Sequence, residues 1–214
     1  MIIDCISDLH GYYPELPGGD LLIVGGDLTA RDIPSEYEKF EKDWLRHQKY
    51  RKKIEIAGNH DNWIFFTGRR VNDYYDYLCD SVTEFEGLKI WGSPWTQTFE
   101  GMNPNCEAFT LDTDEELNEK WKLIPNDTDI LITHCPPFGI YDSIQDVYSG
   151  ECIETGSISL RNKVMSMPKL KLHVFGHIHE HGGKMLDTTI CKFVNASHVN
   201  EKYKPVNGFV RVEL

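Results

Sequence analysis

Five short apolar stretches of this chain each run directly into a polar side chain that can bind a metal ion or move a proton. The clearest stretch is residues 52–57, which ends at the tight turn Gly58-Asn59-His60-Asp61. Short stretches in which both the odd and the even positions are apolar predict strands that are buried on both faces, as in parallel sheets. The five predicted strands are residues 1–7, 21–24, 52–57, 129–133 and 172–175. A sheet of such strands presents its polar residues along one edge.

The segments around these strands carry helical and hairpin patterns. Apolar stripes and capping residues predict three helices, over residues 35–48, 114–124 and 157–166. A shorter helix is expected in the tyrosine-rich segment 74–77. Alternating patterns predict a hairpin, with strands over residues 82–85 and 88–92. They also predict two later antiparallel strands, over residues 188–194 and 208–212. The chain has no internal repeat, low-complexity segment or linker. We therefore expect residues 1–214 to form one domain of the α/β class.

The balance of charge narrows the class of partner. With 34 acidic and 22 basic residues the formal net charge is −12. This argues against sequence-independent binding of duplex nucleic acid, because that binding requires a cationic surface. A small anionic substrate would need local positive charge, which metal ions can supply. No apolar stretch is long enough to span a membrane, and the six cysteines form no Cys-x-x-Cys pair, so we expect reduced thiols in a cytoplasmic protein without membrane association.

The polar residues at the five strand ends form one chemically coherent set. Taken alone, Asp8-Leu9-His10 fits a capped turn, Gly26-Asp27 fits an ordinary turn, and the two histidines at 177 and 179 fit a solvated surface. Their common position after buried strands favours a shared site instead. Carboxylate, amide and imidazole groups suit two divalent ions that share one carboxylate. The candidate ligands are Asp8, His10, Asp27, Asn59, His134, His177 and His179.

In this order the polar blocks resemble the five signature blocks of the calcineurin-like metallophosphoesterases. The blocks are Asp8-Leu9-His10, Gly26-Asp27, Gly58-Asn59-His60-Asp61, His134 and Gly176-His177-Ile178-His179. Further runs resemble the metallophosphoesterase-domain-containing (MPPED) subgroup, which is related to class III cyclic-nucleotide phosphodiesterases. These runs are residues 93–95, 130–137, 173–180 and 195–197. The resemblance covers nearly the whole chain.

The resemblance implies a fold and a set of roles for the candidate residues. The implied fold is a four-layer α/β/β/α sandwich of two mixed sheets flanked by helices. The implied site holds two divalent metal ions, with Mn²⁺ the first expectation and Fe, Zn, Ni, Co or Mg the alternatives. One ion would take Asp8, His10, Asp27 and His179, and the other would take Asp27, Asn59, His134 and His177. His60 would contact the phosphate or protonate the leaving group, and Asp61 would orient His60.

The function that this resemblance implies is hydrolysis of small phosphodiesters by attack of a metal-bound hydroxide. Cyclic nucleotides, either 2′,3′ or 3′,5′, are the substrates first expected. A phosphomonoesterase, a nucleotide pyrophosphatase and a non-catalytic scaffold of the same fold remain alternatives. A protein serine/threonine phosphatase is disfavoured, because that branch carries an Asp-Arg-Gly element and this chain reads Leu28-Thr29-Ala30-Arg31-Asp32 at the corresponding place.

Overall fold

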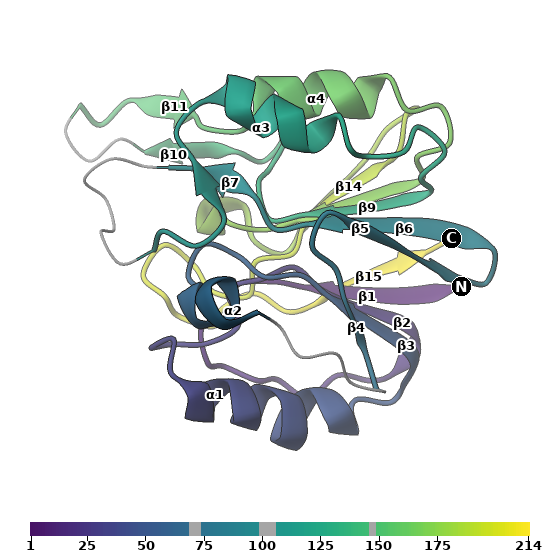
Figure 1. The fold of residues 1–214 in the computed structure, drawn as a ribbon, viewed down its shortest axis with the longest axis vertical. Helices are drawn as coiled ribbons and strands as arrows, with labels where there is room; N and C mark the ends of the chain where they lie inside the picture. Colours follow the sequence, from purple (N-terminus) through teal and green to yellow (C-terminus); the bar gives the residue numbers. More distant parts are fainter. Residues whose placement is uncertain (69–73, 99–105, 146–148) are drawn as a thin grey trace.

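Two mixed sheets lie face to face between layers of helix (Figure 1). The computed structural model describes residues 1–68, 74–98, 106–145 and 149–214. The first sheet has the order β15 (Val210–Glu213), β1 (Ile2–Ile6), β2 (Gly19–Val24), β3 (Tyr50–Glu55) and β4 (Asp76–Tyr77). Strands β1 to β4 pair in parallel, and β15 is antiparallel to β1.

The second sheet also has a parallel centre. Its order is β13 (Lys184–Asp187), β14 (Lys192–Asn195), β12 (Leu172–Phe175), β9 (Ile130–Thr133), β6 (Leu88–Ser93) and β5 (Ser81–Phe85). The edge strands β13 and β5 are antiparallel to their neighbours, and the other pairs are parallel. Two small pairs lie outside the sheets, namely β7 (Thr96–Gln97) with β8 (Thr110–Leu111) and β10 (Ser143–Gln145) with β11 (Cys152–Glu154).

Helices cover the outer face of each sheet (Figure 1). On the first sheet α1 (Pro34–Glu38) continues as a π-helical stretch, Lys39–Trp44, and a 3₁₀ turn, Leu45–His47. The second sheet is covered by α3 (Asp114–Trp121) and α4 (Ile158–Met165). The short helix α2 (Asn62–Thr67) begins directly after Asp61, and a 3₁₀ turn spans His179–His181. None of the helices in the described segments is long and apolar enough to cross a membrane.

Three apolar cores hold the four layers together. The core between the sheets includes Ile3, Ile23 and Val174. Because successive side chains of a strand point to opposite faces, Leu22 and Val24 of the same strand β2 enter the core under α1 instead. A third core lies under α3 and α4. Burial on both faces explains why the central strands are apolar at both parities.

The predicted α/β sandwich with two mixed sheets is confirmed, and one local prediction is wrong. The tyrosine-rich segment expected to be a helix around residues 74–77 contains strand β4, whose Asp76 and Tyr77 pair with Ile54 and Glu55 of β3. This segment pairs along the outer edge of β3, and such pairing is not visible in local sequence patterns. The two antiparallel strands predicted near the end of the chain correspond to β14, which is antiparallel to β13 and also parallel to β12, and to β15, which is antiparallel to β1.

The buried ring of Trp121 provides a test of the third core. Its side chain is fully buried and its Nε1–H donates to Ser157 Oγ at 3.0 Å. We expect Trp121→Ala to lower the free energy of unfolding by about 3–5 kcal/mol, since it leaves a large cavity. Leu123→Ala is the control, because this side chain is 53% exposed, and should change that energy by less than about 1 kcal/mol. Urea unfolding followed by far-UV circular dichroism measures both; equal effects would contradict the assigned packing.

Candidate metal centre

The C-terminal ends of strands from both sheets meet at one place. Asp27 follows β2 and Asn59 follows β3 of the first sheet, whereas His134 and His177 follow β9 and β12 of the second. His134 Nε2 lies 3.4 Å from Asp27 Oδ2 and 3.1 Å from Asn59 Oδ1. His177 Nδ1 lies 3.0 Å from the same Asn59 oxygen. The two sheets therefore bring residues separated by more than one hundred positions into direct contact.

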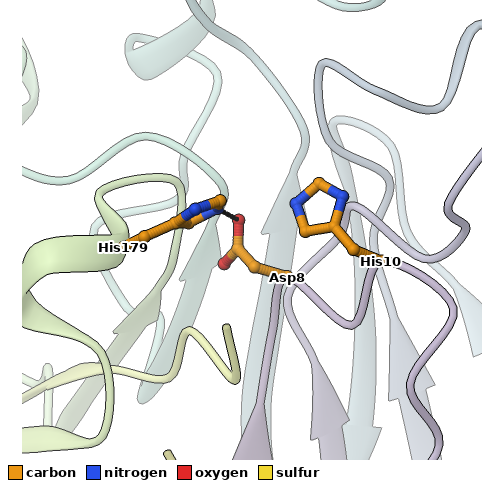
Figure 2. A group of neighbouring side chains, drawn as sticks. All are labelled: Asp8, His10 and His179. Atoms are coloured by element: carbon orange, nitrogen blue, oxygen red, sulfur yellow. Dashed lines mark hydrogen bonds and ion pairs between the residues drawn. The ribbon is translucent and has the colours of Figure 1, made fainter. Parts of the chain in front are cut away.

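Asp8 is the centre of one group of candidate ligands. Figure 2 shows its carboxylate between the rings of His10 and His179, and His179 Nε2 lies 3.2 Å from Asp8 Oδ1. Single ligand atoms of these three residues all lie within 4.8 Å of one another. The backbone N–H of His177 donates to the Asp8 carboxylate at 3.1 Å, and the Ser197 hydroxyl donates to Oδ2 at 2.8 Å. These bonds fix the carboxylate while leaving it close to both imidazoles.

Asp27 joins this group to a second one. Its Oδ2 lies 3.7 Å from His10 Nε2 and 3.8 Å from His60 Nε2, in addition to the 3.4 Å contact with His134. Asp27 forms one compact cluster with His10 and His60, and another with Asp8 and His134. Its carboxylate is therefore shared by ligands from both sheets.

The backbone at the strand ends adopts conformations that most residues avoid. Asp8, His10, Asp27 and His177 have φ values of +50°, +40°, +53° and +68°. A non-glycine residue in this left-handed region costs about 1–3 kcal/mol and is retained mostly where function requires it. Gly58 is required for another reason, since a Cβ atom there would lie 2.3 Å from Asp27 Oδ1 and 2.6 Å from His134 Cε1.

The protonation states of the candidate ligands follow from burial and from the charges around them. Burial lowers the pKa of His10 to about 4 and that of His177 to about 3, so both imidazoles are uncharged at neutral pH. Burial alone would raise the pKa of the Asp27 carboxyl, but the charges of His134 and His60 outweigh burial and hold it well below its usual range. The Asp27 charge in turn outweighs burial at His134 and raises the pKa of that imidazole to about 9, so His134 would release a proton when it binds a metal ion.

His10 adds direct support for a bound cation. Its Nε2 is buried and has no hydrogen-bond partner among the described residues. A buried polar atom without a partner is unfavourable, and a metal ion at this place would satisfy it. The donor set of carboxylates, an amide and imidazoles is that of Mn, Fe or Zn sites. The residues present therefore fit divalent metal ions.

Asp61 has partners different from the expected one. Its Oδ2 accepts the backbone N–H groups of Gly58 and Asp27 at 2.8 and 2.9 Å, and its Oδ1 accepts that of Leu28 at 3.2 Å and the Tyr37 hydroxyl at 3.0 Å. These hydrogen bonds, made within the described segments, tie the loop after β2 to the loop after β3. Asp61 thus positions the backbone that carries Asp27, and the predicted orientation of His60 by Asp61 stays a prediction.

His60 faces a cavity of ≈ 510 Å³ beside the candidate ligands. Its backbone N–H donates to Asp27 Oδ1 at 2.9 Å, and its ring Nδ1 lies 3.1 Å from Cys106 Sγ. Sequence reasoning did not identify Cys106 at this position, nor Ser197 beside Asp8. Ser197 offered a signal, because it follows strand β14 as Asp8 follows β1. Cys106 offered none, since it comes from a loop with no strand pattern.

Comparison with known proteins identifies the family of this chain. The family model described as Calcineurin-like phosphoesterase matches residues 1–181. The chain is 37% identical to Metallophosphoesterase domain-containing protein 1 of Homo sapiens, over 98% of this chain and 70% of that protein. It is 28% identical to a protein of Nostoc sp. named as a 3′,5′-cyclic-nucleotide phosphodiesterase, over 78% of this chain and 57% of the relative.

Solved structures show the same fold at low sequence identity. Phosphopantetheinyl hydrolase from Mycobacterium tuberculosis superposes with a TM-score of 0.60 at 17% identity, over 98% of this chain and 95% of the other. The protein TT1561 of Thermus thermophilus gives a TM-score of 0.58 at 15% identity, over 93% of this chain and 89% of the other. The fold, the matched family model and the relative at 37% identity agree: this chain belongs to the calcineurin-like phosphoesterases, which are metal-dependent hydrolases of phosphoric esters.

Proposed function

We propose that this chain hydrolyses small phosphodiesters at a centre of two divalent metal ions. The observation that carries the proposal is the position of the Asp27 carboxylate between two groups of metal-binding side chains. A carboxylate that serves two ions is the recurrent feature of two-metal sites for phosphoryl transfer. Asp27 Oδ2 lies 3.7 Å from His10 Nε2 and 3.8 Å from His60 Nε2 of the first sheet, and 3.4 Å from His134 Nε2 of the second.

Seven side chains would hold the two ions. The first ion would be held by Asp8, His10, Asp27 and His179, and the second by Asp27, Asn59, His134 and His177. The contacts that support this division are those of Asp8 with His179 and of Asn59 with His134 and His177. A mixture of carboxylate, amide and imidazole ligands favours Mn²⁺ or Fe²⁺ over Ca²⁺, which prefers oxygen alone.

The residues of the chain have separate tasks in this reaction. Bound divalent ions would polarise the phosphoryl oxygens and make a water molecule more acidic. The His60 ring lies at the wall of the cavity, where it can donate a hydrogen bond to a phosphate oxygen or a proton to the oxygen of the leaving group. Its contact with Cys106 fixes the ring orientation, and the buried Asp61 holds the loop that carries Asp27.

Two observations favour a diester over a monoester. The cavity beside His10 and His60 has room for a second esterified group. A relative that is 28% identical over 78% of this chain is named as a 3′,5′-cyclic-nucleotide phosphodiesterase. Cyclic nucleotides are therefore the first substrates to examine.

The first prediction concerns the substrate class. Protein stripped of metal with a chelator should cleave neither bis-p-nitrophenyl phosphate nor p-nitrophenyl phosphate. After addition of Mn²⁺ we expect kcat/KM for the diester to be at least about tenfold higher than kcat/KM for the monoester. A tenfold difference is on the order of what one good binding contact contributes. Release of p-nitrophenolate measures both rates. Faster cleavage of the monoester would replace the proposal with a phosphomonoesterase.

The second prediction concerns the ligands. Asn59→Ala and Asp27→Ala should each lower Mn²⁺-dependent diester cleavage by more than about a hundredfold, because each removes metal ligands. Both variants should keep the wild-type circular dichroism spectrum. Asn126→Ala is the matched control, since this asparagine is exposed and bonds only to Lys163 in the described structure. Full activity in either ligand variant would disprove the two-metal arrangement.

The third prediction follows from the hydrogen bonds of Asp61. Asp61→Asn replaces one acceptor oxygen with a donor and breaks at least one bond to the loops after β2 and β3. We expect Mn²⁺ to bind about 10–100-fold more weakly, as measured by isothermal titration calorimetry. If Asp61 acted on His60 instead, Mn²⁺ affinity would stay unchanged and only the pH dependence of kcat would move.

A further inference from the structure

Tyr203 is an aromatic residue that lies directly over the candidate metal centre. Its ring centroid is 4.8 Å from that of His10 and 5.2 Å from that of His179, and both pairs are nearly perpendicular. A third, longer contact reaches His60 at 6.1 Å. The ring thus touches candidate ligands and the expected acid at once, although it comes from the segment between β14 and β15.

The backbone holds Tyr203 in a fixed position. The backbone N–H of Tyr203 donates to Asn200 O at 2.8 Å, and Asn200 Oδ1 accepts the N–H groups of Lys202 and Lys204 at 3.0 Å. The start of the segment is joined to the metal-binding loops, because the His198 N–H donates to Ser7 O at 2.8 Å. Tyr203 itself has φ +54°, a conformation uncommon for a bulky residue and most often kept at ligand sites.

Tyr203 also forms part of the wall of the ≈ 510 Å³ cavity that contains His60. A second tyrosine, Tyr12, lines the same cavity, and the two side chains remain 40% and 41% exposed. The rest of the lining includes polar and charged groups, from Thr29, Arg31, Asp32 and Asn62. Aromatic walls with a few polar groups are typical of sites for small organic ligands, and the volume falls within the usual range for such sites. It is larger than a single aryl ring requires.

We infer that Tyr203 determines substrate specificity by stacking on the base of a nucleoside phosphoester whose phosphate lies at the metal centre. This inference rests on the proposed function and names the group that the cavity accepts. Stacking of a base on an aromatic side chain is favourable and tolerant of the base identity. The polar groups of Thr29 and Asn62 suit the ribose and the base edges better than they suit an aryl or alkyl group.

Equilibrium binding tests this inference without turnover. Calorimetric titrations of the Mn²⁺-loaded protein would compare thymidine 5′-monophosphate, phenyl phosphate and methyl phosphate. We expect the nucleotide to bind most tightly to the wild type, and Tyr203→Leu to weaken its binding about tenfold, a typical loss for one stacked base. Tyr203→Phe keeps the ring and should stay within about threefold of wild type. The same Tyr203→Leu change should alter methyl phosphate affinity by less than about twofold.

The outcomes separate a specificity role from a structural one. A uniform loss for nucleotide and methyl phosphate, or no loss for either, would overturn the inference; phenyl phosphate binding as tightly as the nucleotide would overturn the choice of a nucleoside. Phe66→Leu is the matched control, because this ring is 76% exposed on α2 and is not among the described residues that line the cavity. Absence of Mn²⁺-dependent diester cleavage by the wild type would disprove the proposed function, while the titrations would still decide the role of Tyr203.

Discussion

The structure depends on keeping two carboxylates ionised where water does not reach them. Asp8 and Asp27 are fully or almost fully buried, and burial by itself favours the neutral acid. Nearby imidazoles and hydrogen bonds outweigh burial, so that the pKa of each carboxyl lies below its usual range. The groups that do this come from both sheets, since Asp8 accepts from His177, 169 positions away. Only a fold that joins the ends of two sheets satisfies these carboxylates together.

The need to keep Asp8 and Asp27 ionised explains why nearby parts of the chain adopt unfavourable conformations. Four candidate ligands occupy left-handed backbone, at about 1–3 kcal/mol each, and Asp61 is a third buried carboxylate, whose hydrogen bonds hold the loops after β2 and β3. Such strain persists only where the surroundings determine the conformation completely. The three apolar cores supply that determination, because each loop begins at a strand whose two faces are packed.

The sequence was informative wherever a buried strand fixed the position of the next residue. Asp8, Asp27, Asn59, His134 and His177 became candidates because each follows such a strand, and a sheet aligns strand ends. The orientation of a side chain within a loop has no such rule: Asp61 was expected to face His60, yet it accepts backbone N–H groups from two loops. Tyr203 was missed for the same reason, since its position depends on contacts between segments that have no repeating pattern.

The charge of the chain and the character of the cavity lead to one further point. A net charge of −12 repels phosphate esters at close range, and a monoester, whose second pKa is about 6, carries nearly two negative charges at neutral pH. A diester carries one. The cavity is lined by the uncharged rings of Tyr12 and Tyr203 as well as by one cation and one anion, Arg31 and Asp32, so contacts of a neutral base with the two rings add affinity that the net charge does not oppose. The negative charge of the chain therefore supports our proposal of a singly charged ester with a large neutral group as the substrate.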